Sequence, residues 1–138
     1  MSKNSSGKFS KTKGAGAALL AQLEGRGEKF NKDEVIAIGK TSSNQIVWLE
    51  QGRLNPKASG LAHIIDAHGH QFNGKGISND EIPNYVLTAV TEGKIVGYQG
   101  RGTGRPIYEF TYNGSTHYVA VTIGNNGYIV GANPKSGI

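Results

Sequence analysis

The chain has 138 residues, which suits one domain with a sizeable hydrophobic core, or one domain and a tail. It contains no cysteine, which excludes a disulfide framework, a thiolate metal site and a cysteine nucleophile. Its net charge of +5 makes a polyanion the first partner to consider. No apolar run reaches the roughly 18 residues of a membrane-spanning helix, so we expect no membrane span.

Lysine, serine and glycine dominate residues 1–14. We expect a flexible basic leader here, because such a segment buries too little apolar area to offset the entropy of ordering it. The lysines allow a second interpretation, an arm that contacts phosphates, but we favour the linker. These lysines are Lys3, Lys8, Lys11 and Lys13. The remaining residues, 15–138, are predicted to form a single domain.

The first half of this domain contains a helix signal and two apolar segments. Alanines and leucines in residues 15–24, followed by glycines, predict a short helix. The apolar residues 35–38 are rich in β-branched side chains. Residues 45–50 form a compact apolar stretch, which indicates a strand or a buried turn. We expect Trp48 within it to anchor the core.

Two further helices are predicted before the pattern changes. Residues 61–68 have apolar side chains at helical spacing, and we expect Gly69 to break this helix near its end. Its apolar face contains Leu61, Ile64, Ile65 and His68. Ser78 stands three residues before Glu81, as in a capping box, and an apolar stripe follows on a helix that ends at Gly93.

The second half has the period of two that is typical of strands. Strands are predicted at residues 95–99, 107–112, 118–123 and 128–132, with hairpin turn signals at residues 113–114 and 125–127. The fold class predicted is therefore α+β, with N-terminal helices packed on a C-terminal antiparallel β-meander of about four strands. On the third strand two sets of side chains alternate. Val119, Val121 and Ile123 should face the core, whereas Tyr118, Ala120 and Thr122 form a smaller, wetter face that could line a cleft.

Three of the four histidines fall within residues 63–70. Imidazole can both accept and donate a proton near neutral pH, so a histidine cluster in a basic chain suggests phosphate chemistry. On a regular helix His63 and His68 do not share a face, so one of them can be a packed residue while the other faces a cleft. For His68 packing and catalysis are about equally good interpretations, and for His63 we favour function. His70 reads as a turn residue or a substrate contact, and His117 as a residue at a solvated strand edge or one that reaches the cleft.

Several segments together carry a family resemblance. They are residues 61–68 (LAHIIDAH), 82–83 (IP), 93–96 (GKIV), 105–109 (RPIYE) and 124–134 (GNNGYIVGANP). As a set they resemble the C-terminal RNase toxins of the barnase/EndoU/colicin/RelE (BECR) superfamily. These domains are carried by contact-dependent growth inhibition proteins, other polymorphic toxins and some phage proteins. The resemblance covers roughly residues 45–135.

The resemblance implies a BECR-like fold and a ribonuclease that cuts RNA, often tRNA, without a metal or cofactor. It also implies a tight-binding immunity protein, which the charge of this chain predicts to be acidic. The toxin fragment would be secreted or delivered from a cell surface, and would act in the cytoplasm of a target bacterium. We expect a monomer apart from the immunity complex. Residues 1–44 suit either the nuclease core or a preceding translocation segment.

Site residues are carried over position by position. The two helical histidines match the place where EndoU-like members have their acid and base, and Thr122 matches a late-strand Ser or Thr that contacts substrate. Many relatives carry Arg where this chain has Ala67, so the phosphate charge must be met by another cation. The predicted catalytic residues are His63, His68, Arg105, Thr122 and Tyr108. The predicted substrate-binding residues are Lys75, Lys94, Arg101, His70 and His117.

The chemistry behind this assignment is general acid–base catalysis. A base removes the proton of a 2′-hydroxyl, an acid protonates the leaving oxygen, and a cation stabilises the charge that develops on phosphorus. The product would be a 2′,3′-cyclic phosphate. We assign His63 and His68 to the proton transfers without choosing which is base, and Arg105 and Lys94 to the phosphate charge. Thr122 and Tyr108 are expected to donate orienting hydrogen bonds.

Two other function classes fit parts of the sequence. The basic charge, the tyrosines and the Gly-Arg loop at residues 100–105 suit a non-catalytic RNA-binding module as well as an enzyme. A histidine-based metal hydrolase is a less favoured alternative, because its four ligands would not converge on a regular helix. Those ligands would be His63, Asp66, His68 and His70.

Overall fold

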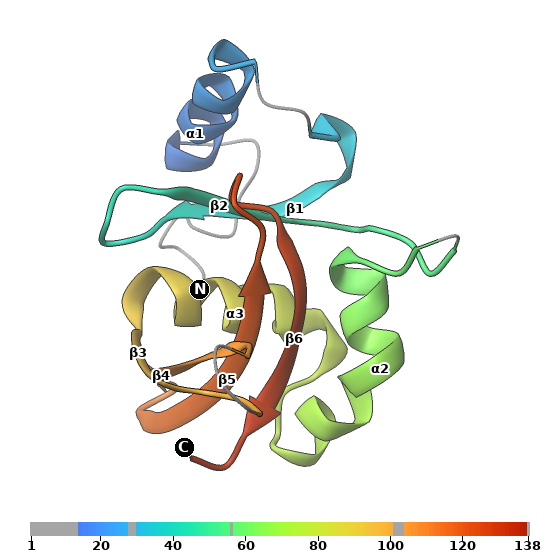
Figure 1. Cartoon of the computed structure of the whole chain (residues 1–138), viewed down its shortest axis with the longest axis vertical. Coiled ribbons are helices and arrows are strands. Elements are labelled where there is room, and N and C mark those ends of the chain that lie inside the picture. Colours follow the sequence, from blue (N-terminus) through green and yellow to red (C-terminus); the bar gives the residue numbers. More distant parts are fainter. Residues whose placement is uncertain (1–13, 28–29, 56, 101–103, 138) are drawn as a thin grey trace.

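The computed structural model describes residues 14–27, 30–55, 57–100 and 104–137 and has the predicted α+β class (Figure 1). The elements in chain order are α1 (Gly14–Gly25), the 3-10 helix η1 (Lys32–Glu34), β1 (Val35–Lys40), β2 (Ile46–Glu50), α2 (Gly60–Gly74), the 3-10 helix η2 (Asn79–Glu81), α3 (Ile82–Glu92), β3 (Lys94–Tyr98), β4 (Pro106–Tyr112), β5 (Ser115–Ile123) and β6 (Ile129–Lys135). The predicted leader lies outside the described residues, except that Gly14 already belongs to α1.

The four C-terminal strands form one antiparallel sheet in the order β3-β4-β5-β6, which confirms the predicted meander. The turn between β4 and β5 has positive φ at both central residues, 51° at Asn113 and 82° at Gly114. This is the backbone that an Asn-Gly hairpin turn requires. The β5–β6 register places three pairs of side chains on one face of the sheet. They are Thr122 with Gly131, Ala120 with Asn133, and Tyr118 with Lys135.

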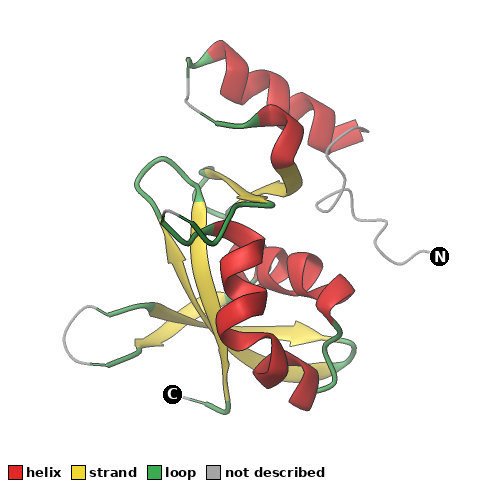
Figure 2. Cartoon of the chain, turned by 90° about the vertical axis from the view of Figure 1, so that its right-hand side faces the viewer, coloured by secondary structure: helices red, strands yellow, loops and turns green. Residues whose placement is uncertain are grey.

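Helices α2 and α3 pack on this sheet as predicted, α3 against β4 and β5 and α2 along β6 (Figure 2). Between them lies a core in which Tyr85, Val119 and Val121 are fully buried. Helix α1 packs elsewhere, because its Leu20 and Leu23 join a second apolar cluster on the β1–β2 hairpin. The helix packing predicted for the meander therefore holds for α2 and α3, whereas α1 covers the hairpin.

A buried tryptophan and a glycine join the hairpin to the meander. Trp48 is fully buried, as predicted, and its backbone N–H donates to the carbonyl of Gly127 at 3.0 Å. Gly127 has a φ of 108°, and a Cβ atom there would lie 2.1 Å from the carbonyl oxygen of Ile46. Only glycine allows the two backbones to approach so closely. This contact holds the hairpin against the start of β6.

The prediction that Gly69 breaks α2 is wrong. The helix continues through Gly69 to Gly74, and Gly69 itself is buried. Glycine weakens a helix by only about 1 kcal/mol relative to alanine, and packing of the next turn offsets that cost. Phe72, in that turn, is fully buried, and Asn79 of η2 lies beside Gly69.

Within the described ranges, no helix has both the length and the apolar character needed to cross a membrane.

Candidate functional site

A glycine on β6 brings a histidine and an arginine together. A Cβ atom at Gly131 would lie 3.2 Å from Nη2 of Arg105 and 3.4 Å from Cδ2 of His63. His63 comes from the first turns of α2 and Arg105 from the residue before β4, and both side chains are half-buried. The missing side chain of Gly131 therefore leaves a space that an imidazole and a guanidinium both border. We call this pair the His63–Arg105 centre.

Of the other predicted catalytic residues, Thr122 lies on the same face as this centre, whereas Tyr108 pairs with Val119 and faces the core side of the sheet. Thr122 is the β5 partner of Gly131, so its side chain shares that face of the sheet. Arg105, Tyr108 and Thr122 line a hollow of about 610 Å³ between the start of β4 and the end of β5. Burial raises the pKa of Tyr108, with a smaller contribution from Tyr98. The phenol therefore stays protonated near neutral pH and can donate a hydrogen bond but cannot act as a base.

The charge of Arg105 is partly withdrawn from water. Burial lowers the pKa of its guanidinium, which still stays charged because this group titrates far above neutral pH. Its Nη1 donates to Oδ1 of Asn133 at 3.0 Å, and no carboxylate forms an ion pair with it in the part of the chain that the structure describes. A half-buried cation with a neutral amide partner gains when an anion binds. The arrangement suits a phosphate oxygen.

Two amides that the sequence patterns did not mark position Arg105, Asn133 directly and Gln99 through Asn133. Asn133 is 9% exposed on β6, and its Nδ2 donates to Oε1 of Gln99 at 2.7 Å. The chain from Gln99 through Asn133 to Arg105 joins both edges of the meander. The alternation of side chains along a strand could have indicated Asn133, because Gly131 and Asn133 are two residues apart and so share a face of the sheet. The pairing with Arg105 depends on the sheet register, which no local pattern reveals.

His68 and His70 do not belong to this centre. Five residues turn an α-helix by about 500°, so His68 points roughly 140° away from His63. Nδ1 of His68 is hydrogen-bonded to Oε1 of Gln71 on the same helix at 2.8 Å, and His70 is exposed. The helix therefore brings only His63 of the predicted pair to Arg105.

The other predicted substrate contacts are spread over the sheet. Lys94 pairs with Glu109 at 3.6 Å, and Arg101 lies outside the described residues. His117 is half-buried on β5, where it pairs with Phe110 of β4 and lies one residue beyond the last pair between β5 and β6. Its Nδ1 is hydrogen-bonded to the hydroxyl of Tyr85 at 2.9 Å. Lys75, at the end of α2, lines a hollow with His117.

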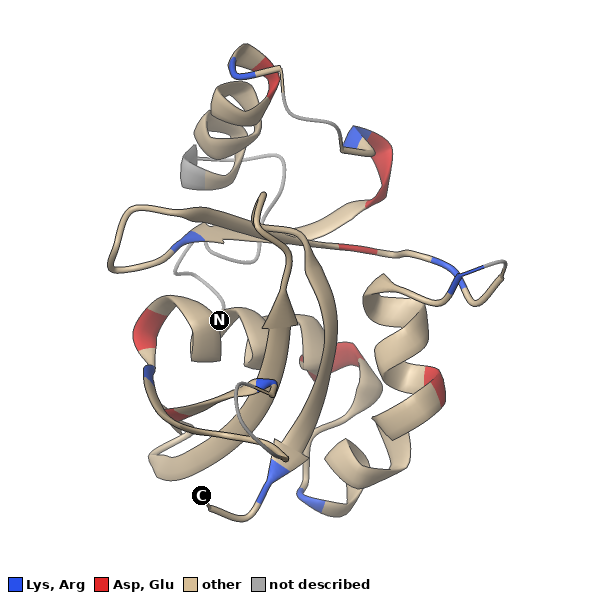
Figure 3. Cartoon of the chain, in the orientation of Figure 1, with Lys and Arg blue, Asp and Glu red and all other residues tan. Residues whose placement is uncertain are grey.

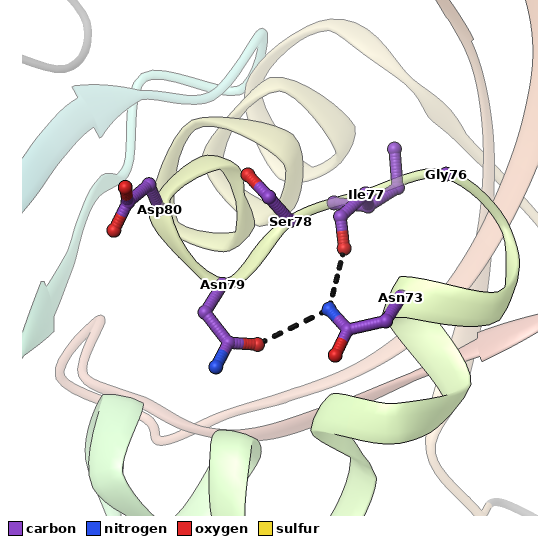
Figure 4. A pocket seen from close by; sticks show the side chains of 6 residues that line it. All are labelled: Asn73, Gly76, Ile77, Ser78, Asn79 and Asp80. Carbon is purple, nitrogen blue, oxygen red and sulfur yellow. Dashed lines mark hydrogen bonds between the residues drawn. The ribbon is translucent and has the colours of Figure 1, made fainter.

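Other hollows have a different chemistry. One of about 520 Å³ lies at the turn from α2 to η2, where Nδ2 of Asn73 donates to the carbonyl of Ile77 and to Oδ1 of Asn79 (Figure 4). Its six lining residues include no histidine, lysine or arginine. Among the described residues no three or more His, Cys, Asp or Glu side chains form a group that could hold a metal ion. The His63–Arg105 centre is taken as the candidate site because it joins a predicted proton-transfer residue to a predicted phosphate-binding cation.

Comparison of the sequence with models of known protein families finds no match, and comparison with curated proteins finds no significant relative.

Proposed function

We propose that this protein is a metal-independent RNA endonuclease of the toxin type, which cuts tRNA and leaves a 2′,3′-cyclic phosphate. The observation that carries the proposal is the meeting of His63 and Arg105 at Gly131, on the sheet face that Thr122 shares. An imidazole beside an unneutralised guanidinium matches what 2′-hydroxyl attack on a phosphodiester needs. The resemblance of the sequence to BECR toxins supports the same reaction.

In this mechanism His63 takes the proton from the 2′-hydroxyl. The 2′-oxygen then bonds to phosphorus, the bond from phosphorus to the 5′-oxygen breaks, and the leaving oxygen takes up a proton. Arg105 stabilises the charge on the phosphate oxygens, and Asn133 holds its guanidinium in place. Thr122, on the same face of the sheet, donates a hydrogen bond that orients the phosphate. The acid that protonates the leaving oxygen is a water molecule, because His68 points away from the centre and Tyr108 faces the core side of the sheet.

The test is a digest of total tRNA with the wild-type protein and three variants. A proton-transfer group is worth about 10²- to 10⁴-fold in rate, so His63→Asn should lose cutting by that factor. Arg105→Ala should lose about 10²- to 10³-fold, the effect of removing one charge-stabilising donor. His68→Asn is the matched comparison on the same helix and should cut nearly as well as wild type. Equal losses in the two histidine variants, with the fold retained, would instead restore the two-histidine mechanism.

The product and the metal requirement separate this function from its alternatives. New 3′ ends should resist phosphatase until acid opens the cyclic phosphate, and cutting should persist in excess EDTA. Loss of activity in EDTA would favour a metal hydrolase. Binding of tRNA without any cutting would favour an RNA-binding module.

The toxin part of the proposal predicts a partner. An acidic immunity protein would complement the +5 net charge and cover the His63–Arg105 centre. A small acidic protein encoded next to this chain should therefore block tRNA cutting when the two are mixed in equal amounts. Full cutting in its presence would count against the toxin assignment and leave the nuclease assignment standing.

A further inference from the structure

A second basic hollow lies at the end of the sheet nearest the C-terminus. It has a volume of about 320 Å³, and its lining combines cations with hydroxyl groups. The lining residues are Lys75, Thr116, His117, Tyr118, Lys135 and Ser136. None of these six carries a carboxylate. Figure 3 shows the basic ends of α2 and β6 meeting there.

The imidazole of His117 is held in a fixed orientation. Its Nδ1 is hydrogen-bonded to the hydroxyl of Tyr85, and rings of Tyr85, Phe110 and Tyr112 surround it at centroid distances of 5.4, 6.0 and 5.8 Å. Burial raises the pKa of Tyr85 strongly, so its hydroxyl stays protonated and can donate a hydrogen bond to Nδ1 of His117. The ring proton then lies on Nε2, and a neutral His117 becomes a hydrogen-bond donor for an anion.

Lys75 and Lys135 supply the positive charge. Lys75 follows the last turn of α2, in the turn that the amide of Asn73 secures through Ile77 and Asn79 (Figure 4). Lys135 is the last residue of β6. The pKa of His117 is lowered mainly by its burial and, to a smaller extent, by the positive charge of Lys75. A bound anion would relieve this repulsion.

The nearest carboxylate on the same face is already occupied. Glu109 is the strand partner of Tyr118 and accepts a hydrogen bond from its hydroxyl at 2.9 Å. Lys94 lies 3.6 Å from the same carboxylate and balances its charge. Among the residues that the structure describes, no carboxylate forms an ion pair with Lys75 or Lys135, so their charge can act on a ligand.

The hollow is in line with the His63–Arg105 centre. Gly131, Asn133 and Lys135 alternate along β6, so all three side-chain positions face the same way. From Gly131 to Lys135 the strand advances by about 13 Å, at roughly 3.3 Å per residue. Tyr118 stands opposite Lys135 and offers a ring on this face at the end of the row, whereas His117, its neighbour in β5, faces the core-side rings and lines the hollow from there. Such a row of a stacking surface flanked by cations is how proteins hold a single-stranded backbone.

We propose that Lys75, Lys135 and His117 form a second phosphate-binding subsite for single-stranded RNA. It rests on the proposed function, because it holds a phosphate further along the strand whose scissile phosphate lies at Arg105. Adjacent phosphates are too close together to occupy both sites, so at least one nucleotide spans the interval and can stack on Tyr118. The substrate class is thus a single-stranded loop or end of several nucleotides, and a dinucleotide reaches only the cutting centre.

Two measurements on the full chain test the subsite. The first is binding of a ten-nucleotide RNA with methylated 2′-hydroxyls, which cannot be cut. Lys75→Ala/Lys135→Ala should bind it at least about tenfold more weakly than wild type, since two charge-assisted contacts are lost. The slope of log affinity against log salt should fall by about two, one for each lysine. The control is Arg26→Ala/Lys32→Ala, which removes the same charge near α1, at the opposite end of the molecule (Figure 1).

The second measurement compares cutting of the ten-nucleotide RNA with cutting of a dinucleotide. The double lysine variant should lose rate on the long substrate and keep the wild-type rate on the dinucleotide. Unchanged binding and unchanged length dependence in this variant, with normal cutting by wild type, would overturn the subsite and leave the nuclease standing. Weakened, less salt-dependent binding without cutting by wild type would support the subsite and overturn the nuclease.

Discussion

Filling the space at Gly131 tests the His63–Arg105 centre without changing either residue. In Gly131→Ala the new Cβ would lie 3.2 Å from the guanidinium and 3.4 Å from the imidazole. The imidazole is then in ordinary contact, whereas the guanidinium must shift by a few tenths of an ångström. A misplacement of about 1 Å costs on the order of 10²-fold in rate, so we expect about a threefold loss for alanine. Gly131→Val adds two methyl groups and should lose at least about 10²-fold.

The assay is kcat/KM for a short RNA, with the melting temperature measured in parallel. Both variants should melt within a few degrees of wild type, because Arg105 is a flexible side chain that can move away and valine favours a strand. Gly25→Ala is the control, since a Cβ at that position meets nothing within 4 Å. Full activity in Gly131→Val would refute the argument, because the imidazole and the guanidinium could not then be acting where they meet.

Three further predictions concern other parts of the molecule. Asn133→Ala should lower kcat/KM by about 10- to 100-fold, because Arg105 loses the amide that positions it. Asn133→Asp should lower it as well, because the new carboxylate neutralises the guanidinium. Wild-type kinetics in both variants would exclude a positioning role for Asn133. Because the pKa of His117 is lowered in the folded state, the unfolded chain takes up this proton at a higher pH than the folded chain does. The free energy of unfolding should therefore fall as the pH drops below about 6.5 and level off below the folded-state pKa of His117. His117→Gln should show a smaller fall in urea melts over this window, and an identical pH profile would contradict the assignment. Gly127→Ala should cost about 3 kcal/mol or more of unfolding free energy, because residue 127 has a φ of 108° and its new Cβ would meet the backbone carbonyl of Ile46. A loss below about 1 kcal/mol in the same urea melts would show that the hairpin docks differently.

Local patterns were enough to predict most of the secondary structure. Alternation of apolar and polar side chains revealed the four strands, and Asn113-Gly114 marked a turn whose positive φ values the structure confirms. These signals work because neighbours in sequence decide backbone conformation and the direction of each side chain. The same locality explains the error at Gly69, where glycine suggested a break but the burial of Phe72 one turn later keeps the helix intact.

The sequence by itself determined the residue types of the site: one imidazole-rich helix, an arginine just before a strand and a threonine on the next strand. Only the tertiary structure decided which of them meet. His63 and His68 look equivalent in the sequence, but the helical rotation turns one to Gly131 and the other to Gln71. Arg105 and Asn133 are 28 residues apart and meet through the register of three strands. Contacts of that kind depend on the packing of the whole sheet, which no short segment encodes.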